Sequence, residues 1–221
     1  ILKIDEINLL NPNSEILEIS VVKKTEPDKL SKVFWLYTIF SFITTLGFTN
    51  FVLIGYHFKV KHVLTDAQIP LFYAIAMGVD AIAALIIGKT YDIFKNRRKN
   101  DKAGLSTLII IPLLSIFIPL FAFTENYILA LVSAIIWGIV MGAHETVMKS
   151  AIADLTTLNK RGTGYGIFNT AYGLAIFIGS VLFGLLYERS IPSIIIFSII
   201  IQFAGILAFF VMRKEAQVGE V

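Results

Sequence analysis

The chain has 221 residues, of which 56% are hydrophobic, and its mean hydropathy is +0.77. A soluble domain contains about 45–50% apolar residues, and the excess here lies in long blocks, which excludes an ordinary soluble globule. The formal net charge is only +3 and there is no cysteine, so the composition points away from nucleic-acid binding and excludes disulfide, zinc-thiolate and thiol chemistry.

Residues 1–32 are polar, of mixed charge, and precede the first apolar block. They lack the basic region and apolar segment that together mark a signal peptide, and the chain starts with Ile1 instead of methionine. We therefore expect a cytoplasmic tail or linker in a chain that begins inside a longer ancestral sequence.

Six apolar blocks follow, each close to the ~20 residues that a helix needs to cross a bilayer. They are residues 33–58, 69–88, 103–123, 127–148, 165–187 and 191–212. The blocks are continuous and do not alternate with polar residues, which favours helices over membrane strands. The sequence predicts an all-α, polytopic membrane protein with six transmembrane helices, a bundle over residues 33–214 and a second tail over residues 215–221.

The basic residues are distributed unevenly over the connections. Of the 19 Lys and Arg residues, sixteen lie in the two tails and in the connections after the second and fourth blocks. Only Lys59, Lys61 and Arg189 lie on the other side. Because positive charge is retained in the cytoplasm, this asymmetry predicts a cell-membrane protein with both termini cytoplasmic.

The blocks also differ in side-chain size. The third and sixth are bulky nearly all round, which is typical of lipid-facing helices, and Pro112 and Pro119 are expected to kink the third. The second, fourth and fifth are rich in small residues, with Gly138 and Gly142 of the fourth in GxxxG spacing, so we expect them to pack against other helices. Both triplets of blocks end in a bulky helix, a weak three-plus-three repeat.

Three motifs resemble those of one transporter family. The first is GKTYD at residues 88–92, followed by Arg97 and Arg98, although Phe94 and Lys95 stand where a glycine is usual. The second is WGIVMGAHETVMKSAIADL at residues 137–155, and the third is KRGTGYGIFNTAYGLAIFIGSVLFGLLYE at residues 160–188. Together with the order of the helices, these motifs resemble the C-terminal half of a major facilitator superfamily transporter, over almost the whole chain. Residues 1–32 then resemble part of the loop that joins two such halves.

The resemblance implies secondary transport of a small solute or ion by alternating access, without a cofactor or enzymatic activity. The family has about twelve spans and only six are found here, so the expected partner, besides lipid, is a second six-helix half, either another copy or a separate chain. One alternative is a truncated interaction subunit that does not transport. A small intramembrane enzyme is disfavoured, because the sequence has no P-loop and no HExxH motif.

Three of the ionisable residues inside the predicted spans are candidates for ion coupling. Asp80 lies at the middle of the second block, where a carboxylate is expensive in lipid, and its i±3 and i±4 neighbours carry no charge. It is either a proton or cation coupling site or a fixed interhelical hydrogen-bonding group. Glu145 and His144 form either a gate or proton relay, or an interfacial Glu145–Lys149 pair beside a packing histidine.

Two further sets of residues are candidates by position. The resemblance implies a charge latch at the cytoplasmic end, although positive-inside anchoring alone explains most of the basic residues. Its members are Gly88, Asp92, Arg97 and Arg98, with Asp154 and Arg161 as an equivalent pair. The polar residues of the first and fifth blocks either line a solute cavity or form interhelical hydrogen bonds. Those residues are Tyr37, Thr44, Thr45, Asn50, Asn169 and Tyr172.

Overall fold

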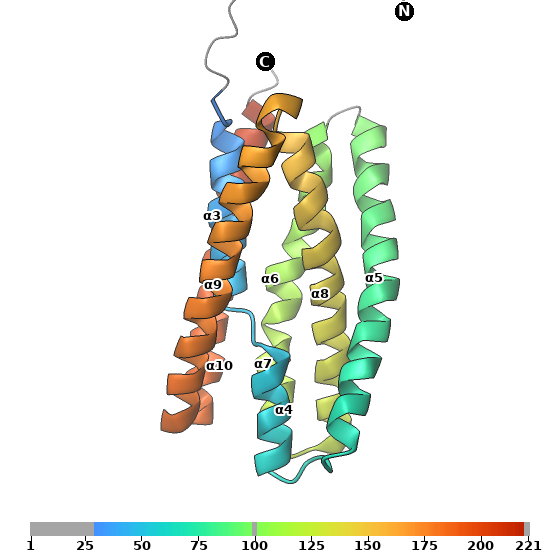
Figure 1. Ribbon diagram of the computed structural model, residues 1–221, viewed down its shortest axis with the longest axis vertical. Helices are drawn as coiled ribbons and strands as arrows, with labels where there is room; N and C mark the ends of the chain where they lie inside the picture. The colour runs from blue at the N-terminus through green and yellow to red at the C-terminus, as the bar shows by residue number, and fades with distance from the viewer. Residues whose placement is uncertain (1–28, 99–100, 219–221) are drawn as a thin grey trace, which may run out of the picture.

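The computed structural model describes residues 29–98 and 101–218 (Figure 1). Within these ranges the chain forms helices and no strand, which confirms the predicted all-α fold. The helices are α3 (Lys32–Leu46), α4 (Phe51–Val60), α5 (Gln68–Arg98), the 3-10 helix η1 (Asp101–Ile109), α6 (Ile110–Ser115), α7 (Phe117–Ala122), α8 (Tyr127–Leu155), the 3-10 turn η2 (Leu158–Lys160), α9 (Arg161–Arg189) and α10 (Ile191–Val218). The predictions for residues 1–28 and 219–221, which cover most of the first tail and the end of the second, lie outside the described residues.

Six helical segments of the described chain are long and apolar enough to cross a membrane. They are Lys32–Val60, Gln68–Arg97, Ala103–Ala122, Tyr127–Leu155, Leu158–Arg189 and Ile191–Gln217. This finding confirms the six predicted spans. The four longest helices continue past the apolar blocks: α5 runs to Arg98, α8 to Leu155, α9 from Arg161 to Arg189, and α10 to Val218, which lies within the predicted second tail.

The helices stand side by side, and α3 begins at the same end of the molecule at which α10 ends (Figure 1). In one group α3 packs against α9 and α10, and in the other α5 packs along α8, with η1, α6 and α7 of the third span beside them. The second piece of the first span, α4, contacts α5. The first span therefore begins in one group of helices and ends in the other. The predicted three-plus-three repeat concerns the order of the spans and stays a prediction.

The close packing of α5 and α8 depends on two glycines of α8. A Cβ atom at Gly138 would collide with the carbonyl oxygen of Ala76, and one at Gly142 would lie 2.6 Å from the carbonyl oxygen of Asp80. Near the other end of the contact, a Cβ at Gly88 would lie 2.9 Å from the methyl carbon of Thr146. The backbones approach closely because these positions have no side chain, as the GxxxG spacing predicts.

Helix α9 is only partly covered by other helices. A Cβ at Gly164 would lie 2.7 Å from the methyl carbon of Thr156, and one at Gly179 would lie 2.7 Å from the carbonyl oxygen of Leu46. Four other glycines of α9 have nothing within 4 Å of a Cβ position: Gly162, Gly166, Gly173 and Gly184. Within the described chain the packing prediction is confirmed at Gly164 and Gly179, and for the face that carries the other four glycines it stays a prediction.

The two bulky spans differ from each other. Helix α10 exposes a stripe of large apolar residues at helical spacing, namely Ile196, Ile200, Phe203, Leu207 and Phe210. The third span is divided into η1, α6 and α7, and Pro112 and Pro119 lie within its two α-helical pieces. Proline removes a backbone donor and crowds the preceding turn, which accounts for the irregular path of this span.

Candidate functional site

The first span is interrupted near its middle, between the end of α3 at Leu46 and the start of α4 at Phe51. The amide of Gly47 closes the last turn of α3 on the carbonyl of Ile43, and the side chain of Asn50 caps α4 by accepting from the amide of Val52 at 3.0 Å. The prediction of one continuous helix over residues 33–58 is therefore wrong. Asn50 is a typical N-cap residue, which accounts for the start of α4 on the far side of the break.

Three side chains from distant helices bind the backbone carbonyls around the break. Ser198 donates to the carbonyl of Gly47 at 2.9 Å, and Gln202 donates to that of Thr44 at 3.0 Å. The indole of Trp137 donates to the carbonyl of Thr49 at 3.0 Å. Irregular backbone at membrane depth is tolerated only where its polar groups find partners in protein or in a wet cavity. These three donors supply such partners, so the break is a stable part of the fold.

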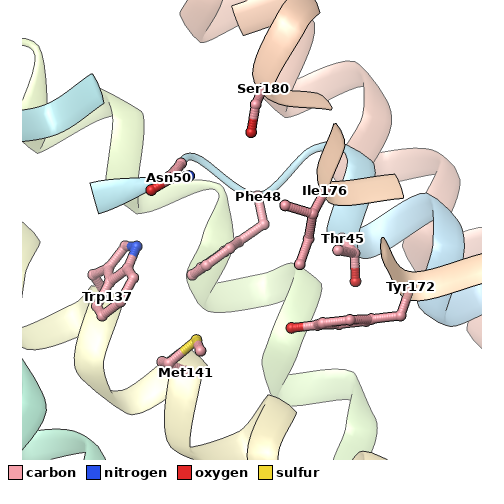
Figure 2. Close-up of a pocket in the computed structure, with 8 residues that line it drawn as sticks. All are labelled: Thr45, Phe48, Asn50, Trp137, Met141, Tyr172, Ile176 and Ser180. Atoms are coloured by element: carbon pink, nitrogen blue, oxygen red, sulfur yellow. The ribbon is translucent and has the colours of Figure 1, made fainter. Parts of the chain in front are cut away.

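Two adjoining cavities lie beside the break. The smaller has a volume of about 120 Å³, and Figure 2 shows its lining residues gathered from α3, α8, α9 and the break itself. They are Thr45, Phe48, Asn50, Trp137, Met141, Tyr172, Ile176 and Ser180. The larger cavity, of about 710 Å³, extends along α4 and the start of α5 and shares Asn50, Trp137 and Met141 with the smaller one. The two cavities therefore meet at these three residues.

Aromatic rings form one wall of this space. Phe48 stacks on Trp137 with 5.7 Å between ring centroids, and Phe51 and Tyr73 lie 5.2 Å and 6.2 Å from the same indole. Phe48 also stacks on His144 at 5.2 Å. The hydrogen bond from the indole to Thr49 fixes the orientation of Trp137, so the aromatic wall and the break hold each other in place.

Three of the predicted cavity residues, Thr45, Asn50 and Tyr172, line the smaller cavity. The other three do not line either cavity. Tyr37 is buried and donates to the carbonyl of Met148 at 2.8 Å, Thr44 donates to the carbonyl of Phe40 at 3.0 Å, and Asn169 is exposed on α9. Five lining residues were not predicted, because neither the apolar residues of a span nor a single serine among them can be assigned to a cavity until the packing of the helices is known. They are Phe48, Trp137, Met141, Ile176 and Ser180.

The three candidate coupling residues have different surroundings. Asp80 is 5% exposed, and within the described chain its Oδ1 has no hydrogen-bond partner. Glu145 is exposed and, among the described residues, makes no ion pair with Lys149, so the predicted interfacial pair does not form. His144 is buried, and its Nδ1 lies 3.4 Å from the hydroxyl of Tyr172. A role of these residues in coupling stays a prediction.

The candidate latch residues are arranged differently from the expectation. Asp154 of α8 accepts from Lys95 at 2.6 Å and from the hydroxyl of Tyr91 at 2.9 Å, both on α5. Arg161 instead donates to the carbonyl of Ala153 at 3.1 Å, so the predicted pairing of Asp154 with Arg161 is wrong. Asp154 pairs with Lys95 instead of Arg161 because α5 packs closely along α8.

The remaining latch residues make no comparable contact that can be described. Asp92 and Arg97 are exposed, and the side chain of Arg98 lies outside the described residues. Gly88 contributes to the close contact of α5 and α8 and carries no charge. The part of the chain that is described contains no group of three or more His, Asp or Glu residues that could hold a metal ion.

Comparison with known proteins supports the same architecture. The profile of the Major Facilitator Superfamily matches residues 38–220. Two curated relatives, the uncharacterized proteins Rv2265 of Mycobacterium tuberculosis and Mb2288 of Mycobacterium bovis, are each 35% identical to this chain over 187 residues. The match covers 85% of this chain and 44% of each relative, so the chain spans less than half the length of these relatives. No solved structure matches the chain.

The profile match covers the first span from residue 38 onward, including its break, the five other spans in full, and every residue that lines the two cavities. The chain therefore belongs to the Major Facilitator Superfamily of membrane transporters.

Proposed function

We propose that this chain is one six-helix half of a secondary transporter, which moves a small solute across the cell membrane by alternating access. The observation that carries the proposal is the pair of adjoining cavities beside the broken first span. Transport requires a solute site inside the bundle, and in transporters such sites form where interrupted helices expose polar backbone and side chains. Thr45 and Asn50 stand at such an interruption.

A second six-helix half is the proposed partner. The open face of α9, with its four uncovered glycines, permits the close backbone approach by which membrane helices pack. The curated relatives are about twice as long as the matched segment, which leaves room in them for another bundle. The second half is either a different six-helix segment or a second copy of this chain, and mass measurement of the purified protein in detergent distinguishes the two.

For ion coupling we propose Asp80. Its carboxyl group is buried, one of its oxygens has no hydrogen-bond partner among residues 29–98 and 101–218, and its helix is long and apolar enough to cross the bilayer. An intramembrane carboxylate without a fixed partner is free to exchange a proton or cation during the transport cycle. Glu145 and His144, which lie on α8 beyond Met141, are proposed as further members of the same path.

For orientation we propose that both termini lie in the cytoplasm, on the basis of the uneven distribution of Lys and Arg. Reporter tags placed after Phe58 and after Phe123 are expected to lie outside the cell. A cytoplasmic location of both tags would overturn the orientation and the six-span arrangement that depends on it.

Reconstitution into liposomes tests the transport proposal with a mixture of solutes, so that the transported one need not be chosen in advance. Liposomes that contain the full protein are loaded with the small-molecule fraction of a cell extract, and the solutes that they lose are identified by mass spectrometry against protein-free liposomes. We expect the loss of a small set of related solutes. Asp80→Asn is expected to abolish the dependence of this loss on an imposed ion gradient, whereas neutralising the exposed carboxylate of Glu188, which lines neither cavity, with Glu188→Gln leaves it intact.

A non-transporting interaction subunit is the rival function, and this assay addresses it directly. If no solute leaves the liposomes although the protein is folded and associated with its second half, the transport proposal fails. Flux that is equal in the wild type and in Asp80→Asn under every gradient would keep transport and remove Asp80 from the coupling mechanism.

A further inference from the structure

We infer that the smaller cavity binds the ring of a neutral, flat, ring-bearing solute, and that a hydroxyl or amide group of that solute bonds to Thr45. This inference names the substrate class of the proposed transport site and so rests on the proposed function. It is carried by the chemistry of the two cavity walls, by an unpaired buried hydroxyl and by the lack of charge in the lining.

One wall is suited to a flat ring. Phe48 and Trp137 stack on each other at 5.7 Å, and Met141 and Ile176 complete an apolar surface around them (Figure 2). Aromatic and thioether groups favour stacked and edge contacts with another ring. The volume of about 120 Å³ suits a single six-membered ring, since an apolar cavity of roughly 150 Å³ accommodates benzene. The rest of a larger solute would extend into the 710 Å³ cavity.

The other wall offers hydrogen bonds. Thr45 lines the cavity and is only 2% exposed, and within the described chain its buried hydroxyl has no hydrogen-bond partner. The hydroxyl of Tyr172, held 3.4 Å from His144, lies on the same side of the cavity (Figure 2). A buried hydroxyl without a partner is costly, and a polar group of a bound solute removes that cost. Thr45 therefore selects a solute with a hydrogen-bonding group next to its ring.

The charge of the lining indicates a neutral solute. Among the described residues that line the two cavities, only Lys59 is charged, and it lies in the larger cavity in an ion pair with Asp66 at 3.1 Å. Asp80 and Glu145 line neither cavity. Moving an ion into an apolar cavity without a counter-charge is unfavourable, so a charged solute is rejected from the smaller cavity.

Tryptophan fluorescence provides the test, because the chain has 2 tryptophans and Trp137 lines both cavities. The variant Trp35→Phe leaves Trp137 as the one reporter in the chain. The probes are 4-bromobenzyl alcohol, 4-bromobenzoate and 4-bromobenzylammonium, which share a ring and a quenching bromine and differ in charge. In the full protein in detergent we expect saturable quenching by the alcohol and at least about tenfold weaker binding of the two ions.

Matched variants separate the site from partition into detergent. Thr45→Val removes the hydroxyl and is expected to weaken binding of the alcohol about 2- to 12-fold, and Thr45→Ser restores it. Thr44→Val, the same change at the neighbouring residue that lines neither cavity, leaves binding unchanged. Trp137→Phe, which leaves Trp35 as the reporter, gives quenching that does not saturate.

The outcomes distinguish this inference from the proposed function. Tighter binding of either ion, or equal binding to Thr45→Val and the wild type, overturns the neutral, hydrogen-bonding class, while transport found in the liposome assay would still stand. Saturable binding of the alcohol with the expected variant pattern supports the site, even if no solute is transported and the proposed function fails.

Discussion

The substitution Gly142→Ala tests the contact between α5 and α8 on which the second group of helices depends. The added methyl group would lie 2.6 Å from the carbonyl oxygen of Asp80 and 2.8 Å from the amide nitrogen of Ala84, and ordinary contact begins at 3.4 Å. The two backbones must therefore separate by about 0.8 Å, the difference between 3.4 and 2.6 Å. A gap of that size forfeits a quarter to a half of the dispersion energy of the contacts involved.

The expected cost follows from two opposed effects. Overpacking costs about 1–3 kcal/mol, and replacing glycine by alanine within a helix returns up to about 1 kcal/mol. Gly78→Ala on α5 is the matched control, because nothing lies within 4 Å of its Cβ position and it retains only the helical gain. The two variants should therefore differ by the overpacking cost alone, about 1–3 kcal/mol.

Thermal unfolding in detergent, followed by loss of the monodisperse peak in size-exclusion chromatography, provides the assay. A change of 1 kcal/mol shifts the midpoint by about 2–4 °C for a chain of this size, so Gly142→Ala is expected to unfold measurably below Gly78→Ala. Equal midpoints, or a higher midpoint for Gly142→Ala, would refute the close approach of α5 and α8 that the structure describes.

Three other substitutions test separate features. Ser198→Ala removes the donor to the carbonyl of Gly47 and should lower the free energy of unfolding, followed by thermal unfolding, by about 1–3 kcal/mol. Ser193→Ala, at the exposed end of the same helix, should lower it only slightly. Equal effects of the two changes would show that the Ser198 hydrogen bond does not stabilise the break. A double-mutant cycle of Lys95→Met and Asp154→Asn measures the coupling energy of this ion pair. We expect it to exceed the coupling energy of the exposed Lys59–Asp66 pair, which is worth about 0–1 kcal/mol. A smaller coupling energy for Lys95–Asp154 would contradict a latch between α5 and α8. Gly173→Leu on the open face of α9 should leave the isolated bundle stable but disrupt association with the second half, as measured by crosslinking; unchanged association would remove this face from the interface.

The number and position of the spans could be predicted from the sequence because they depend on hydropathy over about 20 residues, which the local sequence contains. The break in the first span could not, because Gly47 and Asn50 are compatible with either a continuous or an interrupted helix. The outcome depends on Trp137, Ser198 and Gln202, which supply donors from helices far away in the sequence. The residues next to the break do not indicate where such donors will lie.

The candidate site was predicted in part for a similar reason. Thr44 and Thr45 are adjacent in α3 and hence about 100° apart around its axis, so at most one of them points into a narrow cavity. Hydropathy and residue type treat the two alike, and only the positions of α8 and α9 decide that Thr45 lines the cavity while Thr44 bonds to its own helix. The same applies to the glycines of α9. Their small size indicates that another helix can approach closely, but it does not indicate which helix.

The four residues between α3 and α4 form a short non-helical linker between two rigid helices. Helix α3 lies against α9 and α10, and α4 contacts α5. A tilt of either helix can be accommodated by rotation about backbone bonds of the linker, without breaking any hydrogen bond inside α3 or α4. Any change in the angle between the two helices has to rearrange the three side-chain hydrogen bonds at the break, each worth about 0.5–1.5 kcal/mol, as well as the ring contacts of Phe48.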